Sequence, residues 1–267
     1  MGLLRARLRS ADFAARSLCG VLDADPVARP GEAIDPAAAR RPALSGRVVS
    51  LQVGRPASLA WRGREISTSI VKRPVRGPLV LGPDGFPGDE QADRDNHGGR
   101  DKAACLYPLE HVPAWEALIG TRLPRGAFGE NLSVNGLVEP DVHIGDVFAL
   151  GQARVQVSQP RGPCFKLAAR WGRKDIPARM AREGISGFYV RVLGPGAVSP
   201  GDWMELLERR STVSVAEVMR VTYRVRADGA ALRAVLDVPE LAASWRDGLR
   251  QVAARSALPV GDFGTDD

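Results

Sequence analysis

Cysteine, histidine and lysine are scarce in this sequence, and each scarcity excludes a kind of site. Three cysteines (Cys19, Cys105 and Cys164) and three histidines occur among the 267 residues, beside four lysines and 33 arginines. The cysteines are odd in number and far apart, so we expect no disulfides and take the reducing cytoplasm as the compartment. No C-x-x-C or H-x-x-x-H spacing occurs, so a zinc site is not expected.

Long apolar runs and clustered positive charge are also missing. No stretch approaches the roughly 18 apolar residues that cross a membrane, so we expect no membrane partner. Residues 46–212 carry 23 basic and 18 acidic side chains without any Lys/Arg-rich run, so we expect no nucleic-acid partner. This mildly basic block favours an anionic small molecule instead. Neither a phosphate-binding P-loop nor a dinucleotide glycine pattern occurs.

The first 45 residues are rich in arginine and alanine and then in proline. They contain no apolar stretch of the secretory kind, and residue 6 is not the Ser or Thr that myristoylation needs. We expect a poorly ordered N-terminal extension over residues 1–45. An organellar targeting segment and an over-long start of the chain remain open alternatives.

Glycine and proline are plentiful, at 29 and 20 residues, which is typical of short strands joined by many turns. Gly151 separates two apolar runs as in a hairpin. The pattern predicts a mainly β fold with some α, built on a closed or nearly closed β-barrel over residues 46–210. The predicted strands are Arg47–Val53, Glu65–Val71 continuing to Lys72, Lys102–Tyr107, Asp146–Leu150, Arg154–Gln159, Gly187–Leu193 and Asp202–Leu207.

The chain after residue 210 changes from strand-like to helical patterning. Ser214 and Glu217 have the spacing of a capping box, and three short amphipathic helices follow. We expect a small three-helix bundle over residues 211–257, which docks on the barrel or on a partner, and a tail over residues 258–267. The apolar face of the third helix is predicted to comprise Leu241, Trp245, Leu249 and Val252. The other predicted helices are Pro108–Ile119, Cys164–Trp171, Pro177–Glu183 and Ala230–Leu236.

Cys164 is the leading candidate for chemistry. It ends the stretch Ser158-Gln-Pro-Arg-Gly-Pro-Cys164, whose prolines and glycine favour a fixed turn between a strand and a helix. Backbone N–H groups at a helix start, with Arg161 and Lys166 nearby, favour the thiolate form of a cysteine. A thiolate attacks carbon or binds a soft metal. The alternative is a small buried residue that caps the helix.

A polar loop from Gly88 to Lys102 forms a second constellation. Within it, His97 suits proton transfer or a hydrogen bond to a ligand, and Asp93 is a further polar candidate. Gly98 and Gly99 permit the close approach of a ligand to the backbone. The alternative is a solvated acidic loop with a structural histidine.

Two weaker candidates precede and follow this loop. Glu130 and Asn131 in Phe128-Gly-Glu-Asn-Leu132 lie between a glycine and a strand, where they face a pocket or form a local turn. Lys72 ends a predicted strand and faces either the pocket or the solvent. His111 and Cys105 are interpreted as a structural histidine and a core residue.

These motifs, in this order, resemble the MOSC family, the domain found at the C-terminus of molybdenum cofactor sulfurases, and in particular its stand-alone YiiM-like branch. The helical tail resembles the three-helix extension of that branch. The resemblance covers residues 46–207, and each motif alone is weak. The matching stretches are Ile70-Val-Lys72-Arg-Pro74-Val, Gly88-Asp-Glu-Gln-Ala-Asp93, His97-Gly-Gly99, Phe128-Gly-Glu-Asn-Leu132, Ile144-Gly-Asp146 and Ser158-Gln-Pro-Arg161-Gly-Pro-Cys164.

The resemblance implies a β-barrel enzyme that binds the molybdopterin form of the molybdenum cofactor, with Cys164 as the thiolate ligand of the metal and no need for pyridoxal phosphate. It implies reduction of N-hydroxylated bases, such as the detoxification of 6-hydroxylaminopurine, with electrons from a separate reductase. His97 and Lys72 become the candidate proton donors, and a homodimer is possible. Residues expected around the cofactor are Asp93, Gly98, Gly99, Asn131, Arg161 and Cys164.

Two other functions remain open for the same fold. Cys164 would carry a persulfide and pass its sulfur to an acceptor, or the chain would be a non-catalytic module that holds a pterin while its helical tail binds a partner. The sequence itself contains no flavin or iron–sulfur motif, so reductive chemistry requires an external electron donor.

Overall fold

The structure, a computed structural model, describes residues 44–93, 97–224 and 229–255. Residues 1–43 of the predicted N-terminal extension, including Cys19, lie outside these ranges, as does the predicted tail. The first described strand begins at Ser45.

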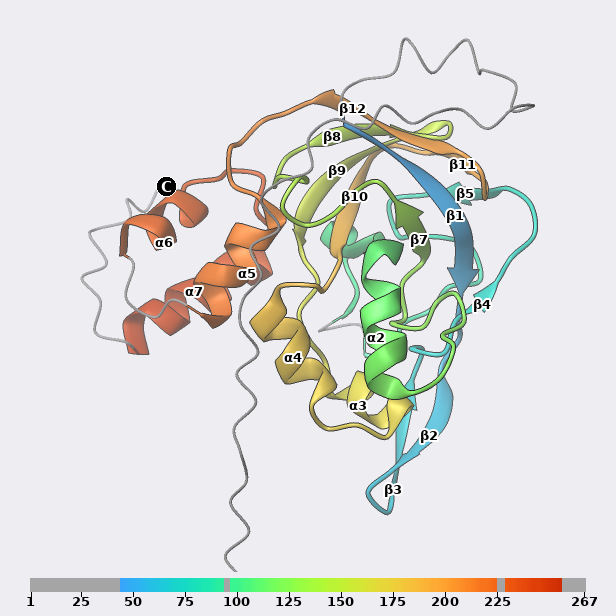
Figure 1. The fold of residues 1–267 in the computed structure, drawn as a ribbon. Helices are drawn as coiled ribbons and strands as arrows, with labels where there is room; N and C mark the ends of the chain where they lie inside the picture. Colours follow the sequence, from blue (N-terminus) through green and yellow to red (C-terminus); the bar gives the residue numbers. More distant parts are fainter. Residues whose placement is uncertain (1–43, 94–96, 225–228, 256–267) are drawn as a thin grey trace, which may run out of the picture. The chain divides into compact units, whose positions relative to one another are not determined.

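Seven strands form the closed barrel that the turn-rich sequence predicts. They are β1 (Ser45–Val53), β6 (Ala104–Pro108), β7 (Leu132–Asn135), β8 (Val147–Leu150), β9 (Ala153–Pro160), β10 (Phe188–Gly194) and β12 (Trp203–Glu208). Hydrogen bonding follows the order β12-β8-β9-β10-β6-β7-β1, and β1 also pairs with β12, so the sheet closes on itself (Figure 1). Closure satisfies the edges that an open sheet of these strands would expose.

Alternation along the strands fills the barrel with apolar side chains. Val155 and Val157 of β9 and Val190 of β10 are fully buried, as are Leu106 and Phe148 from other strands. One neighbouring pair, β6 and β7, is parallel. A parallel pair needs a crossover, and the intervening chain supplies it with the short 3-10 helix η3 (Leu109–His111) and α2 (Val112–Ile119).

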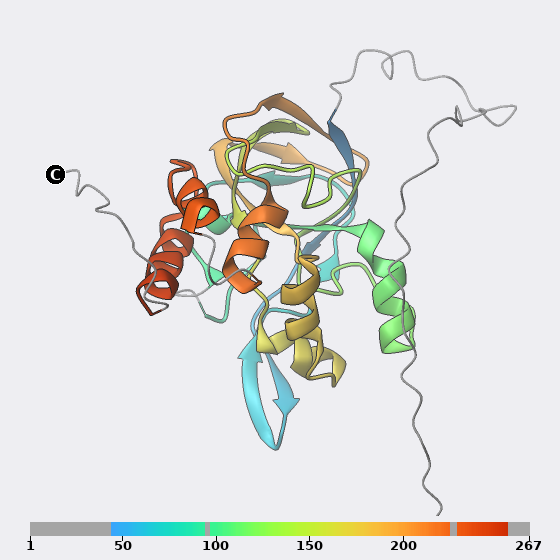
Figure 2. The same cartoon turned by 60° about the vertical axis from the view of Figure 1, so that its left-hand side comes forward.

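The β2–β3 hairpin extends away from the barrel. Its strands, β2 (Ala57–Trp61) and β3 (Arg64–Thr68), pair only with each other and reach beyond the barrel in both ribbon views (Figure 2). The predicted strand from Glu65 to Lys72 is therefore too long. After Thr68 the chain leaves the hairpin, because Ile70 packs into a core with Phe128, and Lys72 precedes the two-residue strand β4 (Arg73–Pro74).

Several short elements complete the barrel region. β5 (Leu79–Leu81) pairs with β11 (Gly196–Val198), and the 3-10 helix η2 (Arg100–Lys102) leads into β6. The helices α3 (Phe165–Trp171) and α4 (Ile176–Glu183) follow β9. Together with α2 they cover a second apolar core, which holds Tyr107, Trp115, Phe128, Leu167, Ile176 and Met180 among others.

The three predicted C-terminal helices are present as α5 (Val215–Tyr223), α6 (Gly229–Leu236) and α7 (Ala243–Arg255). Ser214 caps α5, since its hydroxyl accepts a hydrogen bond from the Glu217 N–H at 3.1 Å. Their apolar faces belong to the same core cluster as the barrel interior, so the helices dock on the barrel. Val252 is the exception, because it is 39% exposed and Ala253 takes the buried position instead. None of the helices in the described ranges is long and apolar enough to cross a membrane.

Candidate active site

Neighbouring barrel strands bring one row of side chains to the floor of a cavity. In the strand register Gln159 of β9 lies opposite Tyr189 of β10, and Tyr189 lies opposite Cys105 of β6. The Cys105 N–H donates to Asn131 Oδ1 at 3.1 Å, and the Asn131 N–H donates to the Cys105 carbonyl at 2.8 Å. Tyr189, Cys105 and Asn131 all line the cavity, so its floor is fixed by the barrel itself.

Cys105 contributes a neutral wall to this cavity. It lies in a buried strand as the sequence predicts, and burial raises the pKa of its thiol to about 11. The Tyr189 side chain hydrogen-bonds to the same thiol, and burial raises the pKa of the phenol as well. Both groups therefore stay protonated near neutral pH.

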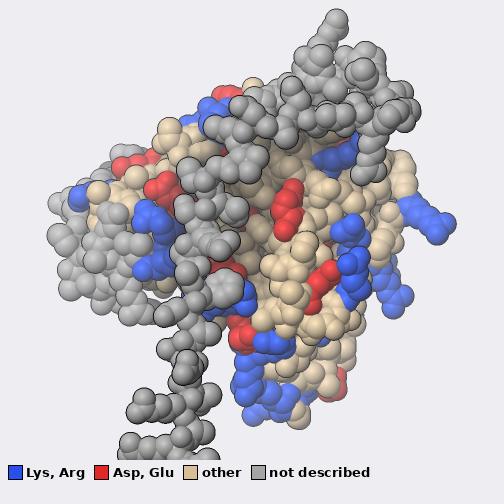
Figure 3. Space-filling view, in the orientation of Figure 1, with Lys and Arg blue, Asp and Glu red and all other residues tan. Residues whose placement is uncertain are grey.

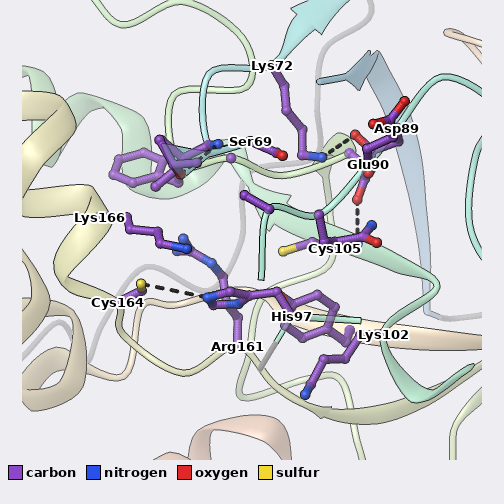
Figure 4. A pocket seen from close by; sticks show the side chains of 18 of the residues that line it. Ser69, Lys72, Asp89, Glu90, His97, Lys102, Cys105, Arg161, Cys164 and Lys166 are labelled. Carbon is purple, nitrogen blue, oxygen red and sulfur yellow. Dashed lines mark hydrogen bonds and ion pairs between the residues drawn. The ribbon is translucent and has the colours of Figure 1, made fainter. Parts of the chain in front are cut away.

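Lys72 and Asp89 form a buried ion pair in the cavity wall, across the view from Cys164 and Arg161 in Figure 4. Their side chains are only 7% and 4% exposed. Asp89 also accepts hydrogen bonds from the Gly54 N–H at 2.8 Å and from Asn131 Nδ2 at 2.9 Å. Lys72 thus lines the cavity as predicted, but its ammonium group is already paired with Asp89.

Glu130 does not line the cavity, so of the two alternatives that the sequence left open for Glu130 and Asn131, only Asn131 faces the pocket. The buried carboxylate of Glu130 accepts hydrogen bonds from the Gly126 and Phe128 N–H groups and from the Ser133 hydroxyl, and burial raises its pKa. It thereby clamps the loop before β7. Gly129 in this loop has φ +79°, and a Cβ there would lie 2.8 Å from Ile70 Cγ1, so only glycine fits.

Arg161 presents a buried positive charge without an acidic partner. Its side chain lines the inner cavity just after β9, and the residue is 6% exposed. No carboxylate among the described residues forms an ion pair with it. Its recorded side-chain contact is a 3.5 Å approach of Nη1 to the sulfur of Met180. Buried charges are normally paired, so this guanidinium is arranged to receive an anion.

Cys164 stands at the N-cap of α3 with its sulfur directed toward His97. It begins the helix as the sequence predicts, and its side chain makes no capping hydrogen bond, in contrast to the alternative of a residue that caps the helix. Cys164 Sγ lies 3.9 Å from His97 Nε2. Burial lowers the pKa of the imidazole below its usual 6.5, and the Lys166 ammonium lowers it further. His97 is therefore neutral near pH 7 and sits beside the sulfur as a group that can accept or relay a proton.

The cavity has two connected chambers. The inner one, of about 90 Å³, holds Lys72, Asp89, Arg161 and the floor residues, and the outer one, of about 490 Å³, extends toward α7. Volumes of roughly 300–1,000 Å³ are usual for ligand pockets, so the outer chamber alone can accept a small molecule. The residues that line both chambers, and therefore mark their junction, are His97, Lys102, Gly162, Cys164, Lys166 and Tyr189.

The predicted site residues are distributed unevenly over these chambers. His97 and Cys164 meet at the junction, Lys72, Asn131 and Arg161 line the inner chamber, and Asp93 lines only the outer one. Gly98 and Gly99 line neither chamber within the described ranges. Gly99 does adopt positive φ, at +95°, but it serves the turn into η2 rather than contact with the cavity.

Asp89, Tyr189 and Lys102 line the cavity but were not among the candidate residues of the sequence analysis. Asp89 is one of several acids in its loop, and nothing local distinguishes the one that pairs with Lys72. Tyr189 lies between the buried Phe188 and Val190, so its side chain is on the other face of β10. This alternation can be read from the sequence, but it does not show that the other face lines a cavity. Lys102 and Lys166 flank motifs that the sequence did mark, and both reach the junction.

The chain combines a closed barrel, a cysteine beside a buried arginine in the cavity, and three C-terminal helices. Comparisons with known proteins identify the class of protein that has these features. Residues 93–205 match the MOSC domain, and residues 213–251 match the YiiM-like, 3-alpha helix domain. The chain belongs to the MOSC domain family, which is associated with the molybdenum cofactor, and its helical extension is that of the YiiM-like proteins.

Individual relatives cover most of the chain. YflK of Bacillus subtilis is 47% identical over 80% of this chain and 96% of its own length, and YiiM of Escherichia coli is 36% identical over 75% and 86%. A reductase of Gibberella moniliformis is 35% identical over 73% of this chain, but the match spans only 35% of that longer protein. The crystal structure of YiiM from Geobacillus stearothermophilus superposes with a TM-score of 0.66 at 38% identity, and covers 78% of this chain and 98% of its own.

Proposed function

We propose that this protein binds the molybdenum cofactor with Cys164 as the ligand of the metal and reduces N-hydroxylated bases or related N-hydroxylated compounds. The observation that carries the proposal is that Arg161, buried and without an ion-pair partner among the described residues, lines the same cavity as Cys164. A cavity that holds a soft sulfur and a buried guanidinium suits a ligand that combines a soft metal with an anionic group.

The residues of the cavity fit the molybdopterin form of the cofactor in their chemistry. Cysteine sulfur is a soft ligand that suits molybdenum, and guanidinium groups bind phosphate oxygens in pairs. We assign the metal to Cys164 and the phosphate to Arg161, with Asn131 as a further contact. When bound, the cofactor supplies the redox chemistry, which the protein side chains cannot provide. A reducing cytoplasm would keep Cys164 available as a thiol.

The proposed reaction breaks one N–O bond. An N-hydroxylated amine takes up two electrons and two protons and yields the amine and water. Neutral His97 adjoins both chambers and is placed to pass a proton at its Nε2, beside the sulfur. Lys72 has no such role in this proposal, because Asp89 neutralises it. The electrons come from an external reductase, since the described part of the chain offers no other redox group.

The test is the molybdenum and pterin content of the full chain produced in a host that makes the cofactor. We expect the wild type to carry close to one molybdenum per chain and Cys164→Ser to carry less than about a tenth of that, since a soft ligand is lost. Cys105→Ser is the matched control, because this cysteine lines the same cavity but is expected to retain the metal. The purified wild type should then reduce an N-hydroxylated base when a chemical reductant supplies electrons.

Three outcomes of this experiment would contradict the proposal. Equal molybdenum in Cys164→Ser and the wild type would refute the ligand assignment. A mass gain of one sulfur atom on Cys164 after incubation with a desulfurase, without bound molybdenum, would favour a persulfide carrier. Bound cofactor without turnover of any N-hydroxylated compound would favour a non-catalytic module.

The electron donor is expected to be an acidic protein that docks beside the cavity. Residues 165–184, which form α3 and α4, contain six basic and two acidic side chains, and residues 55–76 around the β2–β3 hairpin contain six basic and one acidic. Basic side chains gather at the lower end of the view in Figure 3, where Figure 1 places α3, α4 and this hairpin. Lys72 and Lys166 connect the same two segments to the inner chamber.

This basic surface predicts a strong salt dependence of electron transfer from an acidic donor. Arg62→Glu with Lys174→Glu should reduce the rate constant for donor association about tenfold or more at low salt, because both side chains are exposed. Arg233→Glu with Arg250→Glu, which changes the net charge equally on α6 and α7, is the control and should change the rate little. Equal effects of the two double variants would refute this docking surface.

A further inference from the structure

The outer chamber has two chemically different walls. On the barrel side it is lined by His97, Lys102 and Cys164, which are polar or charged, and by Tyr189. Phe165, which is 54% exposed, and Trp245 of α7 contribute aromatic surface. A ligand in this chamber can therefore contact aromatic rings and also the polar groups that surround the Cys164 sulfur.

The Trp245 ring is anchored to a neighbouring helix by a hydrogen bond. Its indole N–H donates to the Thr222 hydroxyl of α5 at 3.3 Å. The edge of its six-membered ring faces the chain just before Cys164, where a Cβ on Gly162 would lie 3.7 Å from Cζ3 and 3.9 Å from Cη2. These are ordinary contact distances, so the edge of the indole packs beside the chain two residues before the sulfur, and a ligand near Cys164 is also near this ring.

The helix that carries Trp245 is tied to the barrel at its start. The Ala242 N–H donates to the Ser158 carbonyl of β9 at 2.9 Å, and Arg191 Nη2 of β10 donates to the Glu240 carbonyl at 2.8 Å. Ser244 Oγ lies 3.5 Å from Gln159 Oε1 at the same junction. A wall fixed in this way does not have to be ordered when the ligand binds, and this lowers the cost of binding.

We propose that Trp245 and Phe165 form the substrate-selecting wall of the outer chamber, and that they favour planar aromatic N-hydroxylated compounds over small aliphatic ones. Flat heteroaromatic rings bury a large area against aromatic side chains and gain from stacking or edge contacts. A small aliphatic hydroxylamine reaches the same polar groups but cannot use this wall. The inference rests on the proposed function, because that function supplies the reaction. The selectivity itself is a property of ligand binding and can be measured without turnover.

Binding of adenine, as a planar product without the N–O group, tests the wall independently of turnover. Calorimetry on the full chain should show that Trp245→Ala weakens adenine binding by about fivefold to a hundredfold, the range expected for loss of one stacking partner. Phe165→Ala should act in the same direction and carries no risk to folding, because the side chain is largely exposed. Val252→Ala is the matched control on the exposed side of α7 and should leave binding unchanged.

Turnover gives a second readout that separates this inference from the proposed function. With chemically reduced methyl viologen as donor, Trp245→Ala should raise KM for N-hydroxylated adenine by a similar factor and leave KM for N-methylhydroxylamine within about twofold. Unchanged adenine binding in both variants, or equal changes in KM for both substrates, would overturn the inference. If the wild type binds adenine through Trp245 but reduces neither compound, the reaction is wrong while the selecting wall stands.

Discussion

Replacing Arg161 with methionine is expected to stabilise the cofactor-free protein and to abolish its ability to retain the cofactor. The guanidinium is buried without an acidic partner among the described residues, so its desolvation is not compensated in the empty cavity. Substitution of buried charged groups by apolar residues of similar size often stabilises a fold by about 1–4 kcal/mol. Loss of a buried, charged contact to a ligand costs about 2–5 kcal/mol, so cofactor affinity should fall about thirtyfold or more.

Two measurements test whether the substitution raises the stability of the protein and lowers its cofactor content. Urea unfolding of protein from a host that lacks the cofactor should give a higher midpoint for Arg161→Met than for the wild type, and molybdenum analysis of protein from a competent host should give a much lower content. Arg161→Lys is the control, because it keeps the charge but loses the planar pair of donors, and it should lose affinity without gaining stability. A destabilised Arg161→Met that retained the metal would show that Arg161 serves only the fold.

The opposition between stability and binding at Arg161 is typical of functional sites. Lys72 differs from Arg161, because its charge is neutralised within the protein by Asp89. Of these two cations of the inner chamber, Arg161 is available to a ligand and Lys72 is already committed to the fold. This difference explains why Lys72 is assigned to holding the cavity rather than to catalysis.

The barrel and the C-terminal helices could be predicted from the sequence because their signals are local. Alternating apolar residues define β9 and β10, and Ser214 with Glu217 marks the start of α5. The ends of strands and helices were predicted less well where tertiary contacts determine them. β3 ends at Thr68 because Ile70 is drawn into the core beneath α3, and no local pattern reports that contact.

The site could be predicted only in part, for a geometric reason. Glu130 and Asn131 are adjacent, so their side chains diverge, and only Asn131 faces the cavity while Glu130 clamps its own loop. The outer chamber could not be foreseen at all, because its wall combines Phe165 with Trp245, which are distant in the sequence. Helical periodicity did assign Trp245 to an apolar face, but that pattern does not distinguish a core residue from a pocket wall.

The Lys72–Asp89 ion pair anchors the polar loop at the cavity. Lys72→Met is expected to lower the free energy of unfolding by about 3–5 kcal/mol, because it leaves the carboxylate of Asp89 charged and 4% exposed. Asp89→Asn should also be costly, since Lys72 then loses its partner. The double variant removes both charges, so its loss should be smaller than the sum of the two single losses by about 1–3 kcal/mol.

Urea unfolding followed by tryptophan fluorescence measures these differences, and a neighbouring ion pair supplies the control. Arg55 and Glu90 lie 3.4 Å apart beside this pair, but their side chains are 75% and 56% exposed. Arg55→Ala should therefore cost less than about 1 kcal/mol, as exposed ion pairs do. If Lys72→Met costs no more than Arg55→Ala, or if the single losses simply add in the double variant, Asp89 and Lys72 do not act as a buried pair. In that case Lys72 would be available to a ligand in the same way as Arg161.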